Sequence, residues 1–386
     1  MMLYDFSNLF KLWGKDMKKK ILFLIHDLGV GGAEKVLVNL VNHMNRELFD
    51  ITLISLFGGG VNERFIAPHI HYRAIWNKSL PGNSKIMKLL TPKQLHNKII
   101  KEHYEIEISY LEGPCARIIS GCTDSNTKLV SWIHIEQHTP KVAAYAFRCF
   151  EESKRCYERF DRTVCVSEMV RQDFLSIYPT VKNIIVRYNT IETEKILVLK
   201  DEPVDHVGFQ KDEIKLVAVG KISKQKGFDR LARIINRLRM DGFPVHLYAL
   251  GVGRDQKGIE EYLKTNRLEN YFTFLGYQTN PYKYVARCDL FVCASLAEGF
   301  STATMEALVL GTPVCTVEVS GMKELLGQNN EWGVITKNDD QDLYEKIKEL
   351  LRPEMLLHYK EQAKIRGKKF STDETVKAVE DTLLSL

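Results

Sequence analysis

The feature that most constrains the fold of this chain is an alternation of short apolar strands with amphipathic helices, which occurs twice. It begins with KILFLIH at residues 20–26, a glycine-rich turn and a helix-like run at 33–44. It begins again with IKLVAV at residues 214–219, a polar loop and a helix-like run at 228–240. Strands that alternate with helices are typical of parallel βαβ units. The sequence therefore predicts an α/β protein with two doubly wound sheets.

Each half of the chain contains further strand-like runs, at residues 50–57, 107–111, 128–133, 162–166 and 184–186 in the first and 245–250, 271–275, 290–293 and 312–316 in the second. The 386 residues are enough for two domains that each bury a core. We divide the chain into an N-terminal extension (1–16), a first Rossmann-like domain (17–191), a polar linker (192–213), a second Rossmann-like domain (214–365) and a closing helix that can return to the first domain (366–386). Two such domains facing each other form a cleft, and ligands bind at the carboxyl ends of the strands.

The distribution of charge points to an anionic partner for the first half. Residues 1–190 contain 26 Lys and Arg against 19 Asp and Glu, whereas the remainder contains 28 against 30. Residues 73–101 contain seven Lys and Arg, no acidic residue, and interleaved apolar residues; a second basic and aromatic stretch covers 145–162. Such segments suit an anionic membrane surface, although a solvated helical face is the alternative. A nucleic-acid partner is not expected, because the sequence contains no recognised nucleic-acid-binding module.

The compartment follows from what the sequence lacks. No apolar run approaches the roughly 18 residues of a membrane span, and residues 1–20 do not have the pattern of a signal peptide. The eight cysteines form no Cys-x-x-Cys pair, so a zinc knuckle or a thioredoxin-like site is not expected. Several of them lie in apolar strand-like runs, where cysteine acts as a small apolar residue, and this favours a reducing cytoplasm. In the extension, Phe6, Leu9, Phe10 and Trp13 form one helical stripe near several lysines; this suits a membrane interface, and a frayed or packed terminus is the alternative. We expect a cytoplasmic protein, peripheral at the inner face of the cell membrane.

The segment at residues 290–308, LFVCASLAEGFSTATMEAL, carries the strongest candidate site. A helix that begins at Ser301 or Thr302 presents free N–H groups and the positive end of its dipole, which suits a phosphate group. Glu298 and Glu306 lie on either side of this start, and carboxylates accept hydrogen bonds from sugar or ribose hydroxyls. The loop between them adds Gly299, where the backbone can approach a ligand closely, and Phe300.

Two further turns can contact phosphate. In the loop after residue 219, Gly220 precedes Lys221 and Lys226, whose charges can neutralise a diphosphate; a solvated basic loop is the alternative. In the first turn, the backbone of Gly31 and Gly32 can approach a phosphate or sugar across the cleft. This turn does not match the Gly-x-Gly-x-x-Gly fingerprint, and no glycine-rich loop continues into Gly-Lys-Ser/Thr. A dehydrogenase and a P-loop nucleotidase are therefore disfavoured.

His134 follows the strand-like run at residues 128–133, at the edge of the sheet where active sites form. A neutral imidazole at this place can contact a sugar hydroxyl, although a lone histidine is more often structural. His134 and His138 with Glu136 suggest a metal, but no further cluster of ligands is visible in the sequence. We therefore expect no metal site.

Together these segments resemble the retaining glycosyltransferases of family 4, of the type that makes bacterial surface polysaccharides, and this resemblance implies the GT-B fold. Glu298 and Glu306 match the family's two glutamates with seven residues between them. Lys221 and Lys226 match its phosphate-binding basic pair, although Lys221 stands where arginine is more common and lacks the bidentate guanidinium fork.

The resemblance extends to other motifs in the same order. The turn at residues 31–34, GGAE, matches a family motif, and His134 is similar to the family's active-site histidine. Residues 166–168 and 189–191 also look like family landmarks, with Asn-Thr where Asn-Gly is usual. Residues 275–277 resemble the segment whose backbone meets the nucleotide base, which makes Tyr277 and Gln278 candidates for that contact.

The resemblance implies transfer of a hexose or N-acetylhexosamine from a nucleotide sugar to a hydroxyl group, with the anomeric configuration retained. The second domain would hold the donor, with UDP as the most common nucleotide in the family. The first would hold a glycan or a polyprenyl-diphosphate-linked acceptor for cell-surface polysaccharide or glycolipid synthesis. Catalysis would involve His134, Lys226 and Glu298, with Glu306 on the ribose. No cofactor, metal or protein nucleophile is expected, because the helix start and the two lysines can stabilise the leaving diphosphate.

Two alternatives remain open from the sequence. One is a nucleotide-sugar epimerase of the same fold, which would convert its donor without an acceptor. The other is a catalytically inactive, glycosyltransferase-like assembly partner, although the intact Glu298, Lys226 and Glu306 count against it.

Overall fold

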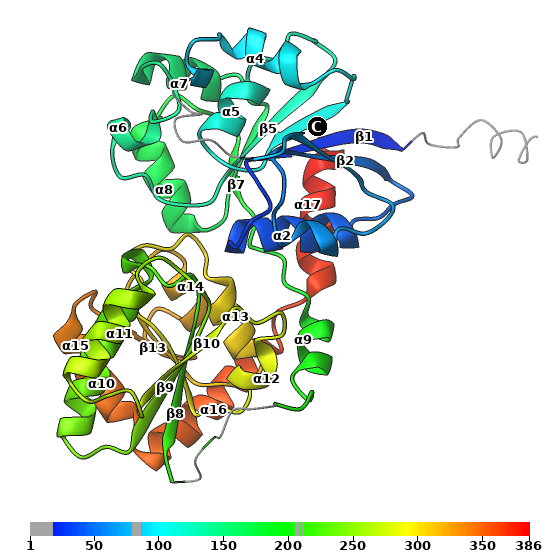
Figure 1. The fold of residues 1–386 in the computed structure, drawn as a ribbon. Helices are drawn as coiled ribbons and strands as arrows, with labels where there is room; N and C mark the ends of the chain where they lie inside the picture. Colours follow the sequence, from blue (N-terminus) through cyan, green and yellow to red (C-terminus); the bar gives the residue numbers. More distant parts are fainter. Residues whose placement is uncertain (1–17, 79–85, 205–208, 210–211) are drawn as a thin grey trace, which may run out of the picture.

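The computed structural model describes residues 18–78, 86–204, 209 and 212–386, which form two lobes. The predicted extension at 1–16 and Lys85 of the basic stretch lie outside these residues. The first, N-terminal lobe is built on a parallel sheet in the order β3-β2-β1-β4-β5-β6-β7 (Figure 1). Its strands are β1 (Lys19–Ile25), β2 (Phe49–Phe57), β3 (His71–Trp76), β4 (Ile106–Ser109), β5 (Lys128–Ile133), β6 (Arg162–Cys165) and β7 (Ile184–Val186).

The second, C-terminal lobe is built on another parallel sheet, in the order β10-β9-β8-β11-β12-β13. Its strands are β8 (Ile214–Val219), β9 (Val245–Leu250), β10 (Phe272–Gly276), β11 (Leu290–Cys293), β12 (Val314–Val317) and β13 (Val334–Thr336). Both sheets are therefore doubly wound, as the alternation in the sequence predicts.

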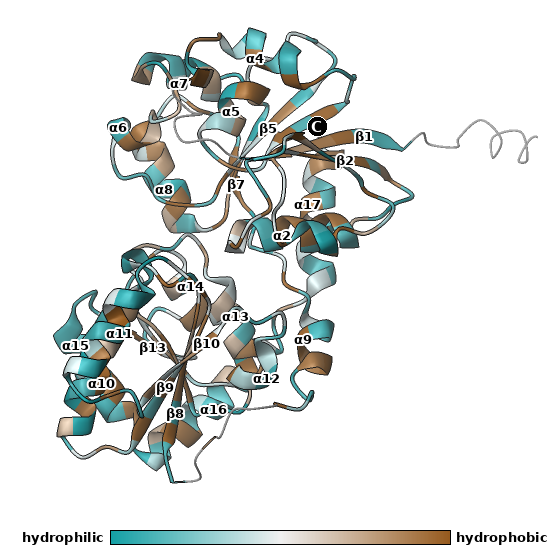
Figure 2. Ribbon diagram, in the orientation of Figure 1, coloured by the Kyte–Doolittle hydropathy of each residue, from teal (hydrophilic) through white to brown (hydrophobic). Residues whose placement is uncertain are grey.

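The central strands are buried because helices cover both faces of each sheet. β1 is apolar along residues 21–25, all fully buried, and β9 is buried throughout. Figure 2 shows apolar colours along the strands and polar colours on the outer helix surfaces. Continuous apolar strands of this kind are typical of parallel sheets with both faces covered.

The helices of the N-terminal lobe are α2 (Gly32–His43), α4 (Pro92–Ile99), α5 (Pro114–Ile119), α6 (Pro140–Ala143), α7 (Phe150–Tyr157) and α8 (Glu168–Ile177). Those of the C-terminal lobe are α10 (Phe228–Met240), α11 (Gln256–Thr265), α12 (Tyr282–Val285), α13 (Thr302–Val309), α14 (Met322–Leu326), α15 (Asp340–Leu350) and α16 (Pro353–Gly367). Short 3-10 turns lie at η1 (Glu63–Phe65) and η2 (Lys224–Lys226). None of the helices in the described part of the chain combines the length and hydropathy that a membrane-spanning helix requires.

Two segments link the lobes. α9 (Thr193–Leu199) lies within the predicted linker, between β7 and β8. The last helix, α17 (Thr372–Leu384), packs against α2 of the N-terminal lobe (Figure 1). There the Arg187 guanidinium donates to the carbonyl of Ala378, at 3.0 Å, and to the hydroxyl of Thr382, at 2.9 Å.

The order of the strands reverses at one place in each sheet, and these two places position the site. β1 lies between β2 and β4, and β8 lies between β9 and β11. The loops after β1 and β4, and those after β8 and β11, run in opposite directions and leave a crevice at each carboxyl edge. In open α/β sheets, this crevice is where ligands bind.

The sequence missed two strands. β3 is an edge strand that is only partly buried, and β13 has three residues. The apolar signal of β3 is weak because the strand is only partly buried and contains polar residues, whereas β13 is as short as β7, which the sequence did predict. Consequently Arg73 and its neighbours, interpreted from sequence as part of a basic surface segment, lie in β3 and pair with β2.

Candidate active site

A cleft of about 800 Å³ lies between the carboxyl edges of the two sheets. All of the residues predicted from sequence line it: Gly31, Gly32, His134, Gly220, Lys221, Lys226, Tyr277, Gln278, Glu298, Gly299, Phe300, Ser301, Thr302 and Glu306. They come from loops that are far apart in the sequence. The two strand-order reversals bring these loops together, as expected for doubly wound sheets.

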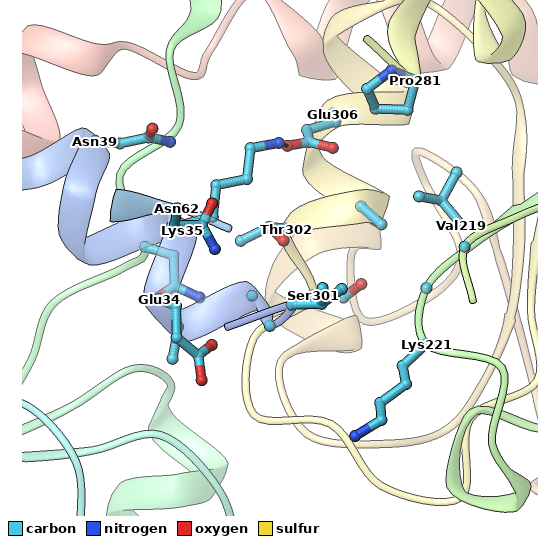
Figure 3. Close-up of a pocket in the computed structure, with 18 of the residues that line it drawn as sticks. Glu34, Lys35, Asn39, Asn62, Val219, Lys221, Pro281, Ser301, Thr302 and Glu306 are labelled. Carbon is cyan, nitrogen blue, oxygen red and sulfur yellow. Dashed lines mark hydrogen bonds and ion pairs between the residues drawn. The ribbon is translucent and has the colours of Figure 1, made fainter. Parts of the chain in front are cut away.

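The start of α13 lies at the centre of the cleft (Figure 3). Ser301 is its N-cap: the Ser301 hydroxyl accepts a hydrogen bond from the Thr304 backbone at 3.3 Å. The first N–H groups of α13 therefore face the cleft with the positive end of the helix dipole, an arrangement that attracts an anion. Lys221, in the loop after β8, extends into the same space (Figure 3).

Lys226 and Glu298 form an ion pair. The Lys226 ammonium lies 2.6 and 2.7 Å from the two carboxylate oxygens of Glu298, one of which also accepts from the Ser295 hydroxyl at 2.6 Å. Gly227 allows this loop to pass close to β11. Its φ is +68°, and a Cβ there would lie 2.1 Å from the carbonyl oxygen of Ala294. Lys226, predicted to bind phosphate, and Glu298, predicted to bind the sugar, thus neutralise each other's charge in the free protein.

Glu306 is buried in α13 and pairs with a residue of the other lobe. Its Oε1 atom lies 2.6 Å from the ammonium of Lys35, in α2, and 3.4 Å from the hydroxyl of Tyr282, in α12. The Lys35 ammonium also donates to the Tyr282 hydroxyl at 2.8 Å. Sequence reasoning missed Lys35 and Tyr282. The only available signal was the place of Lys35 in the first turn of the helix that follows the glycine-rich turn.

His134 faces the cleft from the N-terminal lobe as a neutral imidazole. Burial lowers the pKa of His134 to about 3, against the opposing effect of a hydrogen bond to the Tyr110 backbone. Its Nε2 atom is buried and has no partner among the described residues. The backbone N–H of His134 donates to the carboxylate of Glu112, at 3.0 Å, and burial raises the pKa of Glu112. An unpartnered, unprotonated nitrogen can accept a hydrogen bond from a substrate hydroxyl.

Gly299 and Phe300 connect the lobes. A Cβ on Gly299 would lie 1.6 Å from the His134 carbonyl oxygen, so the missing side chain makes room for the opposite lobe rather than for a ligand alone. The Phe300 ring stacks on Tyr188 with centroids 4.8 Å apart, and its carbonyl accepts from the Asn189 side chain at 2.9 Å. Gly299 and Phe300 therefore join the two lobes at one edge of the cleft.

The predicted base contacts lie at the rim of the cleft after β10. Tyr277 is exposed there, whereas the amide of Gln278 donates to the Leu275 carbonyl at 2.6 Å and accepts from the Tyr284 hydroxyl at 3.3 Å. The Gln278 side chain is therefore engaged by its own loop and by the following helix α12.

Glu34 is a further acidic residue of the cleft that sequence reasoning did not assign to the site. Burial raises its pKa to about 7, and the nearby Asp27 carboxylate adds to the rise. In Figure 3, Glu34 and Lys221 point into the space between the lobes from opposite sides. Asn62 also lines this part of the cleft, where its side chain donates to the Gly29 carbonyl at 2.5 Å.

Two groups of described residues could hold a metal ion, and neither lines the cleft. One is His96 with Glu107 and Cys122, and the other is Glu136 with His138 and Asp173. In the first, the His96 imidazole already lies 2.8 Å from the Glu107 carboxylate. The second group includes His138 and Glu136, which the sequence suggested as metal ligands together with His134, but His134 is not part of it.

Comparisons with known proteins agree with this geometry. The family model "Glycosyltransferase Family 4" matches residues 30–195, and the model "Glycosyl transferases group 1" matches residues 200–369. A Campylobacter jejuni enzyme is 28% identical over 382 residues, which cover 95% of this chain and 98% of that one. It is named N-acetylgalactosamine-N,N'-diacetylbacillosaminyl-diphospho-undecaprenol 4-alpha-N-acetylgalactosaminyltransferase.

Solved structures show the same architecture. Anabaena HepE, in complex with UDP and glucose, superposes with a TM-score of 0.76 at 19% identity, covering 95% of this chain and all of that one. Staphylococcus aureus TarM, in a complex that contains UDP, superposes with a TM-score of 0.68 at 15% identity, covering 94% and 99%. The two sheets, the cleft between them and the two matching family models lead to one assignment: the chain is a GT-B glycosyltransferase that belongs to glycosyltransferase family 4.

Proposed function

We propose that this enzyme transfers a hexose or N-acetylhexosamine from a UDP-linked sugar to a hydroxyl group of a lipid-linked glycan, with retention of the anomeric configuration. The observation that carries the proposal is the convergence, in one cleft, of an anion site and two carboxylates. Lys221, Lys226 and the start of α13 supply the positive charge, and Glu298 and Glu306 supply acceptors for hydroxyl groups.

In this proposal the donor diphosphate lies at the start of α13, between Lys221 and Lys226. Glu306 accepts from the ribose, and Glu298 accepts from hydroxyls of the transferred sugar. Because Lys226 holds both oxygens of Glu298 in the free protein, sugar hydroxyls replace it when the donor binds. The released ammonium then stabilises the charge that develops on the leaving diphosphate, the largest contribution such a site can make to catalysis.

His134 contacts the sugar from the opposite lobe, with Nε2 as a hydrogen-bond acceptor. The acceptor hydroxyl attacks from the same face as the leaving group, and we assign no protein nucleophile. The chain holds both substrates in a fixed relative orientation and supplies fixed charges. Because the substrates are already in place, much of the entropy that a bimolecular step would lose is lost on binding and does not add to the barrier. No residue of this scheme requires a metal ion.

The relatives support the choice of substrates. HepE and TarM were both solved with UDP, and the Campylobacter enzyme is named for an acceptor linked to undecaprenol through a diphosphate. We assign the donor to residues 214–365 and the acceptor to residues 17–191, with 192–213 as the linker and 366–386 as the closing helix. UDP is preferred over GDP and dTDP.

A lipid-linked acceptor requires contact with a membrane, and one surface of the N-terminal lobe suits it. We define the apolar patch as the exposed side chains of Ile86, Leu89, Val142 and Tyr145. The exposed lysines 93, 98 and 141 lie in the neighbouring helices α4 and α6. Apolar side chains beside cations are typical of proteins that bind anionic bilayers. We therefore place the enzyme in the cytoplasm, peripheral at the inner face of the cell membrane.

The test is a transfer assay with UDP-, GDP- and dTDP-sugars and polyprenyl-diphosphate oligosaccharides, with the product anomer read by NMR. Transfer with retention supports the proposal. Conversion of the donor without acceptor identifies an epimerase instead, and the absence of both reactions with every pair identifies an assembly partner.

The substitution Glu306→Gln should lower kcat/KM by about thirtyfold or more, because a charge-assisted hydrogen bond to the ribose is lost. Glu361→Gln, at an exposed glutamate of α16 that pairs with Lys364, is the matched control and should leave kcat/KM unchanged. Equal turnover by both variants would contradict the role of Glu306, provided that their melting temperatures match the wild type.

A further inference from the structure

Lys35 reaches from α2 in one lobe to α13 in the other (Figure 3). Its ammonium is the ion-pair partner of Glu306, at 2.6 Å, and it lies 5.1 Å from the centroid of the Tyr282 ring. Glu306 is the residue that we assign to the donor ribose. A side chain of the N-terminal lobe therefore controls the environment of a donor ligand in the C-terminal lobe.

Lys35 remains protonated, and therefore positively charged, in this position. Burial acts to lower the pKa of Lys35, but the Glu306 carboxylate and the Tyr282 oxygen together raise it above its ordinary value. Only 9% of the Glu306 side chain is exposed. Removing Lys35 leaves the buried Glu306 carboxylate without its counter-charge, which is costly.

The two carboxylate oxygens of Glu306 have different surroundings. Lys35 and Tyr282 both donate to Oε1. In Figure 3, the second oxygen of Glu306 points away from Lys35, toward the side of the cleft where Val219 and Pro281 lie. A carboxylate whose first oxygen is fixed in this way presents its second to a ligand hydroxyl in one orientation.

We propose that Lys35 is a positioning residue for the donor: it holds the Glu306 carboxylate in one rotamer so that this carboxylate can bind the ribose. The inference rests on the proposed function, in which Glu306 binds the nucleotide ribose. It means that the donor subsite is built from both lobes, and that nucleotide affinity depends on a residue of the acceptor lobe. Lys35 itself does not touch the reacting atoms.

The experiment measures UDP binding by isothermal titration calorimetry and donor kinetics, in the full chain. Lys35→Met should weaken UDP binding by about tenfold, because Glu306 loses the charged hydrogen-bond donor that fixes its orientation toward the ribose. The donor KM should rise by a similar factor with kcat nearly unchanged, because the ribose contact is the same in the ground and transition states. Lys35→Arg, which keeps the charge, should recover most of the affinity.

A double-mutant cycle with Glu306→Gln separates positioning from general structural damage. If Lys35 acts through Glu306, Lys35→Met should change the UDP affinity by less than twofold in the Glu306→Gln background. The matched control is Lys377→Met, in α17 beside α2, which removes a lysine paired with Asp381 and should leave UDP binding as in the wild type.

The outcomes distinguish this inference from the proposed function. A wild-type enzyme that binds none of UDP, GDP and dTDP overturns both. A wild-type enzyme that binds UDP, with Lys35→Met binding it equally well, overturns the role of Lys35 alone. The same tenfold loss from Lys35→Met with and without Glu306 also overturns it, because the lysine would then act by another route.

Discussion

Single titratable groups of the cleft differ sharply in their protonation near neutral pH. Burial lowers the pKa of His134 to about 3, so this imidazole is neutral at every pH where the enzyme works. Burial raises the pKa of Glu34 to about 7, so its carboxyl group is half protonated at neutral pH. Lys221 interacts with Glu34 and acts to lower this pKa. Of His134 and Glu34, only Glu34 therefore changes its charge near neutral pH.

The titration of Glu34 predicts a pH dependence of nucleotide binding. Below pH 7 the carboxyl group is neutral, and above pH 7 it becomes an anion near the proposed diphosphate site, so repulsion weakens binding as pH rises. We expect the ratio of the wild-type Kd for UDP to that of Glu34→Gln to rise from about 1 at pH 6 to about 5 at pH 8. The comparison of the two proteins removes the titration of UDP itself. A ratio that stays constant over this range would show that Glu34 does not sense the diphosphate.

At the scale of elements, two arginines fix the loop at residues 86–90 between β3 and α4. Arg117 donates to the carbonyls of Met87 and Leu90 at 2.8 and 2.7 Å. Arg148 donates to those of Lys88 and Leu89 at 2.7 and 2.8 Å. One acid, Glu152, pairs with the Arg117 guanidinium and accepts from the Arg148 backbone.

This arrangement satisfies four successive carbonyls of the loop, and the apolar side chains are left facing outward. Leu89 is 78% exposed and Ile86 is 62% exposed. Arg148 lies three residues after Tyr145, which brings the two segments of the apolar patch together. The loop is therefore fixed before any partner binds, and its exposed side chains need little further ordering at a membrane.

The loop predicts the membrane contact of this enzyme. Leu89→Glu should abolish flotation with vesicles of phosphatidylglycerol and phosphatidylethanolamine at low salt, because it places an anion within the apolar patch. Leu357→Glu changes another exposed leucine, 63% accessible on α16, and should float like the wild type. Wild-type protein that remains at the bottom of the gradient would remove the membrane proposal, while leaving soluble donor hydrolysis or transfer open to assay.

At the scale of the whole molecule, the cleft depends on how the lobes meet. The Glu324 carboxylate of α14 accepts from the backbone N–H of Glu168 at the start of α8, at 2.9 Å, and burial raises the pKa of Glu324. The backbone of Gly299 lies against that of His134. These contacts, with the Lys35–Glu306 pair, join the acceptor lobe to the donor lobe on several sides of the site.

The contact at Gly299 predicts a defect in assembly of the cleft rather than in folding. Gly299→Ala places a Cβ 1.6 Å from the His134 carbonyl, so the lobes must separate or the loop must shift. We expect kcat/KM to fall by about a hundredfold, since small displacements of reacting groups cost about that much, with a small change in melting temperature. Gly258→Ala is the control: nothing lies within 4 Å of its Cβ position, and as a helical substitution it should stabilise the protein slightly. Full activity in Gly299→Ala would contradict the close contact of the lobes.

The sequence predicted most of the fold because the central strands are apolar along their whole length and the helices between them are amphipathic. β1, β8 and β11 lie within a residue of their predicted positions. β3 and β13 were missed: β3 is only partly buried and includes His71 and Arg73, and β13 has three residues, although β7 is equally short and was predicted. The sequence predicted that α13 begins at Ser301 or Thr302, and in the structure Ser301 is the N-cap residue.

The sequence by itself determined two doubly wound sheets and fourteen of the residues that line the cleft, because these depend on local features: periodicity, glycine at a turn, charge after a strand, and the motifs that resemble the family. Only the tertiary structure decided which of these residues meet. The pairing of Lys35 with Glu306 joins residues 271 positions apart, and that of Lys226 with Glu298 joins residues 72 apart. The first contact depends on the packing of one lobe against the other, and the second on the pairing of β8 with β11 within the C-terminal lobe. No pattern along the chain encodes either of them.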